Sequence, residues 1–328
     1  EATLTEYGES LLSNMDITVY GNNYDSTRKE PKILMGLFPN VLVNGAQGIA
    51  VAITCDLLPY NLKEVIFCLV RMLESPDDKM YAPIPDLPIN GYIDIRGENF
   101  VSVGRVEEKD NELIVTALPF RVLKEDFISR LDKLSLPISQ VKDESSKGDI
   151  FIRIIPKRSY TIDINKIPIR SNLQDNTTLI INGRVVNITW YNLAKKWLHW
   201  QSIIHEKRMK FDIQNLTSKK QEYESKVVLI TRFNDIMQIL KNSDSDSDTI
   251  FELRKKGFND LQIDAILNTT VRRLTRGDLK KLQKQILDLQ SQVMQNTYNL
   301  DKIKNVLIEK LLDLADKLGD SRRSIVLK

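Results

Sequence analysis

Few side chains in this sequence combine a reactive type with a spacing that could do chemistry. The two histidines, His199 and His205, lie in an aromatic-rich helical pattern without an evident charged or nucleophilic partner, so we do not expect acid–base catalysis there. The two cysteines, Cys55 and Cys68, match no metal-ligand spacing and are typical of buried thiols in a reducing compartment. The stretch "SDSDSD", residues 243–248, could offer carboxylates to a metal, but it is also typical of a solvated acidic loop. We predict no metal site in this chain.

The most unusual spacing lies in "FPNVLVNGAQGIAVAI", which runs from Phe38 to Ile53 and is almost wholly apolar. Gly45 and Gly48 interrupt it, and glycine allows both a tight turn and a close approach of the backbone to a ligand. Ile49 follows directly, and its β-branched side chain is stiff. The pattern by itself favours a buried strand with a glycine turn, in which Ile49 packs inside.

The bulk composition sets limits on the class of protein. The chain has 328 residues, of which 42% are apolar, so it can bury a core and has room for one large domain or two or three small ones. Its 47 Lys and Arg residues against 44 Asp and Glu residues do not indicate a nucleic-acid binder, and any basic surface must arise from segregated charges. The sequence contains no signal peptide and no membrane-spanning run, so we expect the cytoplasm.

Three segments with different sequence patterns must position these residues. Residues 1–37 start with a helical pattern, "EATLTEYGESLLSNM", in which Leu4, Leu11, Leu12 and Met15 roughly share a face, and continue as a polar loop. Residues 38–188 have a mixed α/β pattern. It includes a helix in "VLKEDFISRLDKL", a strand in "GDIFIRIIPKRSY" and a hairpin around Asn182 and Gly183.

The remainder of the chain, from residue 189, predicts long helices. Glycine almost disappears, and the last segment carries a heptad seam with one polar member: Leu279, Leu282, Ile286, Leu289, Val293, Asn296, Leu300, Ile303 and Leu307. Two helical stretches, 189–250 and 280–328, indicate an antiparallel hairpin with a small insert, 251–279, at its tip. The seam favours packing within the chain over a zipper of two chains.

Seven segments, in order, resemble the breakage-reunion subunit of type IIA DNA topoisomerases, the family of gyrase A, topoisomerase IV A and the phage medium subunits. They are "NNYDSTRKEP", "FPNVLVNGAQGIAVAI", "LLPYNLKEVI", "ALPFRVLKEDFISRL", "VKDESSKGDIFIRI", "GFNDLQIDAILNTTVRRLT" and "GDSRRSIV". The resemblance covers nearly the whole chain, although Tyr60 stands where histidine is common and the tower segment is short, as in a divergent or phage-like enzyme.

The resemblance implies an α+β fold with four parts. Residues 1–37 would be the end of a winged-helix domain, and residues 38–188 a tower domain that carries a DNA-bending wedge. Residues 189–250 and 280–328 would be the arms of a long antiparallel coiled coil. Residues 251–279 would form a small helical exit-gate domain through which two copies dimerise.

The resemblance also implies where double-stranded DNA binds. Ile49 aligns with the isoleucine that wedges between base pairs in the minor groove and bends the duplex, and this favours an exposed Ile49 over a packed one. Further candidate DNA contacts are Arg28, Lys29, Lys32, Asn44, Gly45, Gln47, Gly48 and Arg121. The alternative for the basic residues is a solvated surface charge run.

The family's nucleophile is a tyrosine that forms a phosphotyrosyl bond with DNA. "EATL" resembles the tail of its motif, so we expect the tyrosine two positions before Glu1, on an upstream segment of the A-type polypeptide, and no catalytic residue in this chain. Tyr7 lacks a preceding arginine and is interpreted as a packed aromatic residue. Mg²⁺ and ATP are both expected on a B-type ATPase/TOPRIM partner, and none is expected in this chain.

The insert at the tip predicts a two-fold interface formed by Phe258, Ile263, Ile266 and Leu267. The alternative is a self-contained small core. The sequence therefore predicts part of a type IIA topoisomerase, an enzyme that changes DNA topology by transient double-strand cleavage and ATP-dependent strand passage. The alternative function is a non-enzymatic DNA-organising scaffold with a coiled-coil hairpin.

Overall fold

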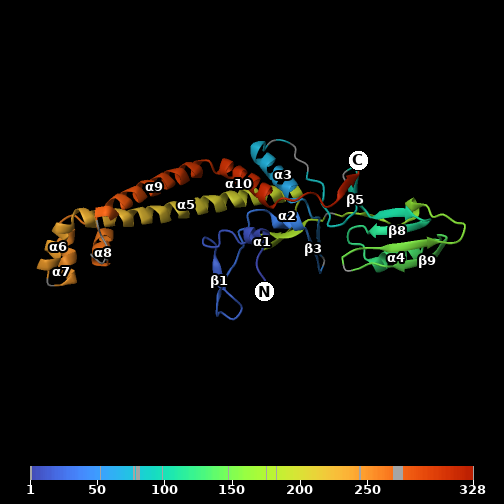
Figure 1. Cartoon of the computed structure of the whole chain (residues 1–328), viewed down its shortest axis with the longest axis horizontal. Coiled ribbons are helices and arrows are strands. Elements are labelled where there is room, and N and C mark those ends of the chain that lie inside the picture. Colours follow the sequence, from blue (N-terminus) through green and yellow to red (C-terminus); the bar gives the residue numbers. More distant parts are fainter. Residues whose placement is uncertain are drawn as a thin grey trace. The chain divides into compact units, whose positions relative to one another are not determined.

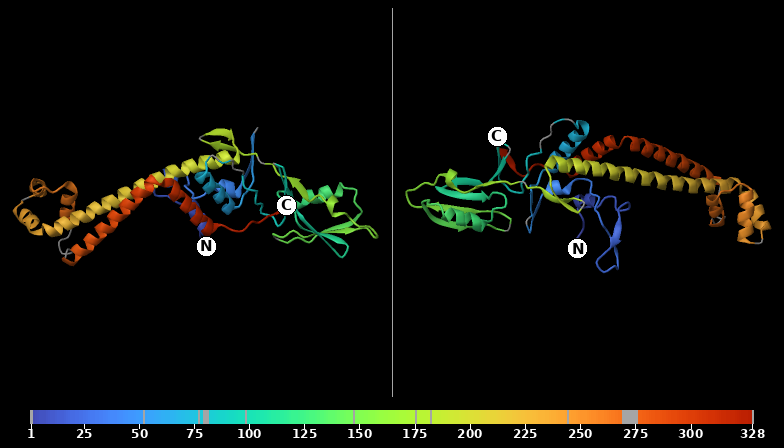
Figure 2. Two further views of the ribbon diagram at one scale, coloured as in Figure 1. Left: turned by 90° about the horizontal axis from the view of Figure 1, so that it is seen from above. Right: turned by 180° about the vertical axis from the view of Figure 1, so that it is seen from behind.

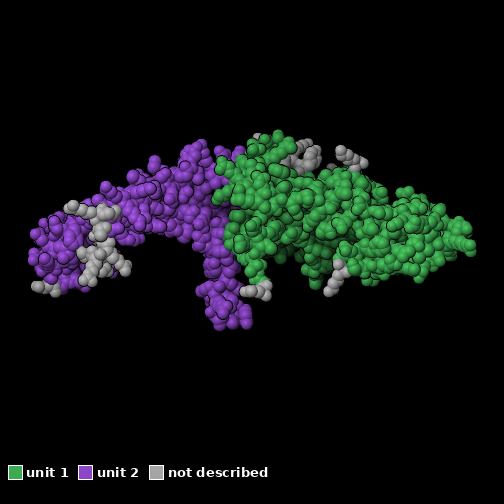
Figure 3. Space-filling view, viewed as in Figure 1, with its two compact units in different colours: residues 1–13, 34–199, 308–328 green, residues 14–33, 200–307 purple. Residues whose placement is uncertain are grey.

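The computed structural model shows a mixed α+β protein. It describes residues 2–51, 53–76, 78, 82–97, 99–146, 148–174, 176–181, 183–243, 245–268 and 276–327. The chain divides into two compact units, drawn in green and purple in Figure 3. Unit 1 comprises residues 1–13, 34–199 and 308–328, and unit 2 comprises residues 14–33 and 200–307. Each unit is therefore built from segments that are distant in the sequence.

Unit 1 contains two four-stranded sheets. The first has the order β11-β6-β5-β14, with β5 (Tyr92–Arg96), β6 (Asn99–Val103), β11 (Arg170–Asn172) and β14 (Ile325–Leu327). β14 pairs in parallel with β5, from which it is separated by more than two hundred positions. The second has the order β7-β8-β10-β9, with β7 (Arg105–Lys109), β8 (Glu112–Ala117), β9 (Ile138–Asp143) and β10 (Ile152–Pro156).

Helix α4 (Lys124–Asp132) packs its apolar residues into the core of the second sheet. Phe127 and Leu131 of α4 are fully buried in one cluster with Val115 of β8 and Ile152 of β10. The spacing of four between the two helical residues places both on one face of the helix. The strand and the helix that the sequence predicted in this region are thus confirmed.

Two short hairpins complete the strands of unit 1. The first joins β3 (Ala46–Ala50) to β4 (Ile53–Leu57), and the second joins β12 (Thr178–Ile181) to β13 (Arg184–Asn187). Gly183 adopts a φ of 74° in the second turn, as a tight turn requires. Asn182 lies outside the described residues. The predicted hairpin of β12 and β13 is confirmed.

Besides α4, unit 1 contains the helical segments α1 (Glu6–Leu11), α2 (Asn40–Asn44), α3 (Leu62–Glu74) and the 3-10 turn η1 (Ile164–Lys166). A side chain caps the start of α1, α3 and η1, whereas α2 begins at Pro39 without a side-chain cap. The Thr5 hydroxyl accepts a hydrogen bond from the Gly8 backbone and starts α1. The predicted helix over the first fifteen residues was therefore too long, because Leu4 precedes the cap and Asn14, at a φ of 59°, follows the last turn.

After the last helix, a buried carboxylate holds the final segment of the chain within unit 1. Asp86 is fully buried, and its Oδ1 accepts hydrogen bonds from the backbone amides of Arg323 (2.9 Å) and Ser324 (3.0 Å) and from the Ser324 hydroxyl (3.0 Å). A buried carboxylate is stable only with such donors. The segment "SRRS" is therefore fixed to the loop before β5.

Unit 2 is a helical hairpin with a β-hairpin at one end. Its helices belong to α5 (Trp190–Thr231), α6 (Phe233–Asn242), α7 (Asp246–Lys255), α8 (Asp260–Asn268), α9 (Arg276–Asp301) and α10 (Ile303–Leu318). α9 runs beside α5 in every view (Figures 1 and 2). The nine predicted seam residues are all buried or half-buried, in agreement with packing within the chain.

The β-hairpin of β1 (Tyr20–Asn22) and β2 (Lys29–Pro31) belongs to unit 2. Arg208 of α5 donates to both carboxylate oxygens of Asp16, at 2.6 and 2.7 Å, just before β1. Both bonds come from one guanidinium nitrogen, Nη1, and are charge-assisted. They attach the start of the hairpin segment to the long helix.

The acidic stretch at residues 243–248 does not form the loop that the sequence predicted. Ser245 caps α7, because its hydroxyl accepts a hydrogen bond from the Asp248 amide at 3.2 Å. Asp246 and Asp248 lie in the first turn of that helix, where negative charge is favourable. Ser245, Asp246 and Asp248 thus form the N-terminus of α7. Asp244 lies outside the described residues.

Candidate nucleic-acid interface

The β3–β4 hairpin, found at the β3 label in Figure 1, carries two exposed branched apolar side chains. Ile49 is 86% exposed and Val51 is 96% exposed. Ile49 lies directly opposite Thr54 in the antiparallel ladder. The alternative in which Ile49 packs inside a buried strand is therefore wrong.

Gly45 forms the tight entry into this hairpin. Its φ is 69°, and a Cβ atom there would lie 2.6 Å from the Leu57 carbonyl oxygen and 2.9 Å from the Pro59 nitrogen. Only glycine combines this backbone with this space. Gly48 is different, because it lies within β3 and a Cβ atom would meet nothing within 4 Å. The prediction that Gly48 lets the chain turn tightly is wrong, whereas its close approach to DNA stays a prediction.

Asn176 fixes the hairpin along the outer edge of β4. Its backbone nitrogen and oxygen exchange hydrogen bonds with those of Asp56, at 3.0 and 2.8 Å. Its side-chain amide donates to the Thr54 carbonyl and hydroxyl oxygens, both at 3.0 Å. β4 is therefore held on both sides, by β3 and by Asn176.

Arg121 holds the same strand from the segment that follows β8. Its guanidinium forms an ion pair with Asp56 of β4 and lies 4.6 Å from the centre of the Phe120 ring. Burial lowers the pKa of Arg121 below its ordinary value. Arg121 also adopts a φ of 61°, which is uncommon for a residue with a side chain. The sequence predicted a DNA contact here, whereas the charge of this arginine is shared with a carboxylate of the hairpin.

Asn44 and Tyr7 both donate a hydrogen bond to the side chain of Asn40. Asn44 Nδ2 donates to Asn40 Oδ1 at 3.0 Å, and the Tyr7 hydroxyl donates to the same oxygen at 2.8 Å. The Tyr7 ring packs edge-on against Phe38, with centroids 4.8 Å apart, and burial raises the pKa of Tyr7. Tyr7 is thus a packed aromatic residue, as the sequence indicated. Asn44 itself is exposed at the end of α2.

The predicted basic residues of unit 2 lie on the exposed β1–β2 hairpin. Arg28, Lys29 and Lys32 are all exposed or half-buried at its surface. In the turn, the Asp25 carboxylate accepts hydrogen bonds from the amide and hydroxyl of Thr27, which lower the pKa of Asp25. Tyr24 is 98% exposed beside it. Tyr24 was not among the predicted residues, although an aromatic residue in a turn-rich loop was the available signal.

The tip of the helical hairpin contains its own core. Three of the four residues predicted for the dimer interface, Phe258, Ile263 and Ile266, are buried there together with Leu229, Ile236, Ile239 and Leu253. These three side chains pack against residues of α5, α6 and α7. They are therefore not available on the surface. Leu267 is 38% exposed, and Leu261 of α8 and Phe251 of α7 are also exposed. Of the four predicted interface residues, only Leu267 thus contributes to the exposed apolar surface of the tip.

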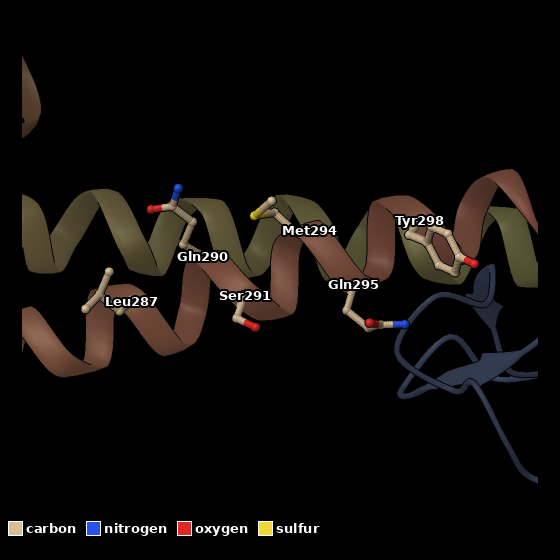
Figure 4. A pocket seen from close by; sticks show the side chains of 6 residues that line it. All are labelled: Leu287, Gln290, Ser291, Met294, Gln295 and Tyr298. Carbon is tan, nitrogen blue, oxygen red and sulfur yellow. The ribbon is translucent and has the colours of Figure 1, made fainter.

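A second exposed apolar row follows α9 itself. A shallow cavity of about 560 Å³ is lined by Leu287, Gln290, Ser291, Met294, Gln295 and Tyr298, whose side chains project from the helix in Figure 4. None of these residues belongs to the seam. Leu287 and Met294 remain largely exposed in the monomer.

The sequence of this chain matches, over residues 1–312, the family described as the A subunit of DNA gyrase/topoisomerase IV. The chain belongs to this family. The DNA gyrase A subunit of Ureaplasma parvum is 28% identical over 367 aligned residues, which cover 100% of this chain and 43% of that protein. The DNA topoisomerase 4 A subunit of Staphylococcus aureus is 27% identical, covering 99% of this chain and 45% of that protein.

A third relative of the gyrase/topoisomerase IV A family comes from a plant. The chloroplastic/mitochondrial DNA gyrase A subunit of Arabidopsis thaliana is 25% identical, covering 96% of this chain and 37% of that protein. The chain thus spans less than half the length of each of these three relatives. The family assignment agrees with the resemblance in the seven ordered segments.

Two features of this family member concern metals and membranes. Within the described ranges, no group of three or more His, Cys, Asp or Glu residues could hold a metal ion. Across the same part of the chain, no helix has both the length and the apolar character needed to cross a bilayer. Cys55 and Cys68 are free thiols, and burial raises the pKa of Cys68 to about 11.

Proposed function

We propose that this chain bends double-stranded DNA as part of a type IIA topoisomerase, with the β3–β4 hairpin as the bending element. The observation that carries the proposal is the exposure of Ile49 on a hairpin whose base is held by Asn176 and Arg121. Membership in the gyrase/topoisomerase IV A family supplies the context, in which DNA is cleaved and a second duplex is passed.

The chemistry of the hairpin suits a wedge in the minor groove. An apolar side chain inserted between base pairs unstacks one step at a cost of roughly a few kcal/mol, which is offset when the bent duplex touches more protein. Ile49 and Val51 are both β-branched and therefore stiff. Gln47 lies on the same strand face as Ile49 and would reach the groove, while Gly48, which has no side chain, would leave room for close approach.

Basic residues would hold the duplex without reading its sequence. In this proposal, Arg28, Lys29 and Lys32 contact backbone phosphates. Asn44 donates to a phosphate or base edge from the end of α2. Arg121 serves the DNA indirectly, because its ion pair with Asp56 steadies the hairpin.

The remaining parts of the reaction would come from other polypeptide segments. The family resemblance assigns Mg²⁺ and ATP to a B-type partner, and no step of the proposal is routed through either in this chain. The nucleophilic tyrosine would be supplied upstream of Glu1. Two copies would dimerise through the exposed side chains at the tip of the helical hairpin.

The test measures DNA bending directly. A duplex of about 30 base pairs, labelled at both ends, reports bending by energy transfer when the chain binds. Ile49→Ala should lower the bent fraction several-fold at saturating protein while the melting temperature stays unchanged, because the side chain is exposed. The matched control is Ile95→Ala, another exposed isoleucine on a strand of unit 1.

Two results would count against the proposal. Unchanged bending by the Ile49 variant would remove the wedge role. The second result combines two measurements: the native chain bends DNA, but Ile49→Ala has no effect on relaxation of plasmid DNA by the complete enzyme with its B-type partner. This combination would favour a DNA-organising scaffold instead.

A further inference from the structure

The hydrogen bonds of Asn176 converge on the strand that faces the wedge. Asn176 Nδ2 donates to both oxygens of Thr54, and Thr54 is the residue directly opposite Ile49 in the ladder. Side chains of directly opposed residues lie on the same face of a hairpin. The asparagine therefore acts at the level of the wedge itself, and not only at the base of the hairpin.

The other half of the Asn176 amide is anchored in the second hairpin. Its Oδ1 accepts a hydrogen bond from the Thr178 hydroxyl and one from Asn187 Nδ2, both at 3.0 Å. Together with the two bonds to Thr54, these use the full capacity of the amide, which has two donor hydrogens and an oxygen with two lone pairs. The amide thus has one orientation that satisfies all of its partners.

A side chain can separate base pairs only if the strand that carries it keeps its position. Ile49 must push base pairs apart against a cost of roughly a few kcal/mol, and an isolated two-stranded hairpin is marginally stable in water. The outer edge of β4 would be open without Asn176, because β3 covers the other edge. The backbone pair with Asp56 and the side-chain bonds to Thr54 give Asn176 the place that a third strand would take along this edge.

We propose that Asn176 is a positioning residue for DNA bending: it locks Thr54 and thereby holds Ile49 in the orientation that enters the duplex. This inference rests on the proposed function of the β3–β4 hairpin. It predicts that the loss of the amide changes DNA bending more than it changes the stability of the protein, since Thr54, which accepts both donations, is exposed.

The experiment is a double-mutant cycle on the same end-labelled duplex. Asn176→Ala and Asn176→Asp should each lower the bent fraction about fivefold to tenfold, because either change removes the two donations to Thr54. Asn176→Asp keeps the acceptor oxygen and the backbone pairing, so it remains informative if the alanine variant folds poorly. The control is Asn165→Ala, which removes an exposed asparagine that donates locally to Asp163.

Combining the changes separates an effect through Ile49 from an independent one. The double variant Ile49→Ala/Asn176→Ala should bend DNA no worse than Ile49→Ala alone, because the positioning residue has nothing left to position. Amide exchange at Asp56 in the free protein should rise about tenfold in Asn176→Ala, which shows the loosened strand without DNA.

The failure of this inference differs from the failure of the proposed function. If Ile49→Ala impairs bending but both Asn176 variants bend DNA normally, or if the two effects simply add, Asn176 is not a positioning residue. If Ile49→Ala itself bends DNA as the native chain does, the wedge proposal fails and the inference fails with it.

Discussion

The Arg322 guanidinium donates to the Glu64 carboxylate at 2.6 Å, across 258 positions of sequence. The same guanidinium donates to the backbone carbonyls of Ile84 and Pro85, at 3.3 and 2.7 Å. One side chain therefore joins helix α3, the loop before β5 and the segment that follows the last helix. Together with the bonds at Asp86, it attaches the returning chain to unit 1.

This ion pair predicts unequal effects of its two halves. Arg322→Met should lower the free energy of unfolding by about 2–4 kcal/mol, because it leaves Glu64 and two carbonyls without their donor. Glu64→Gln should cost only about 1 kcal/mol, since the amide oxygen still accepts a hydrogen bond. Urea unfolding of both variants measures the difference. Equal losses would contradict the interpretation that the arginine serves several acceptors.

Replacement by alanine should destabilise the protein at Gly45 and have almost no effect at Gly48. Gly45→Ala should destabilise unit 1 by about 2 kcal/mol or more, because a positive φ and two main-chain atoms oppose the methyl group. Gly48→Ala meets open space and serves as the control, with a change of less than about 0.5 kcal/mol. Thermal unfolding compares them. A Gly45→Ala protein as stable as the native one would mean that the entry turn has another geometry.

The proposed dimer contact at the tip can be tested with a charge. Leu267→Asp should convert dimers to monomers in light scattering, because a carboxylate buried in an apolar interface loses its hydration without a partner. Leu312→Asp, on α10, is the control, since Leu312 and Leu267 are both 38% exposed. Dimers that persist in the Leu267 variant would direct attention to Leu261 and Phe251 instead.

Cys68 predicts a loss of stability in alkali. Burial of the thiol is the largest cause that raises its pKa from the ordinary value of 9.0 to about 11, so the folded state holds its proton more tightly than the unfolded state. The stabilisation is fully present below pH 9 and is lost as the pH rises towards 11. Urea unfolding across this window should show the decline, and Cys68→Ala should reduce its slope. An unchanged slope would place its origin in other groups.

Periodicity predicted the parts of the fold in which each residue packs against near neighbours. The seam from Leu279 to Leu307, the helix with Phe127 and Leu131, and the hairpin that turns at Gly183 all appear as expected. In each case, the period of the apolar residues or the turn chemistry is a local property. Local rules also explain the error at residues 243–248, where Ser245 could equally begin a helix or belong to a loop.

Long-range pairings and surface exposure could not be read from the pattern. β14 has only three residues, and its partner β5 lies far away in the sequence. Ile49 and Phe258 are both apolar residues next to a loop, yet one is exposed and the other is buried. Only the assembled fold decides which apolar residue covers which, and for Ile49 the family resemblance indicated exposure where the pattern alone favoured burial.

The carboxylate of Asp86 has a consequence for the order of folding. During synthesis, Asp86 leaves the ribosome long before Arg323 and Ser324, which supply all three of the hydrogen bonds described for its Oδ1. In the meantime the carboxylate must stay hydrated, so the loop before β5 cannot close early over an apolar interior. The helices of unit 2 are made in this interval and consist of local contacts, which form quickly. The first sheet of unit 1 is therefore completed only after the helical hairpin has been made, and a chain truncated within α9 would lack β14, its edge strand.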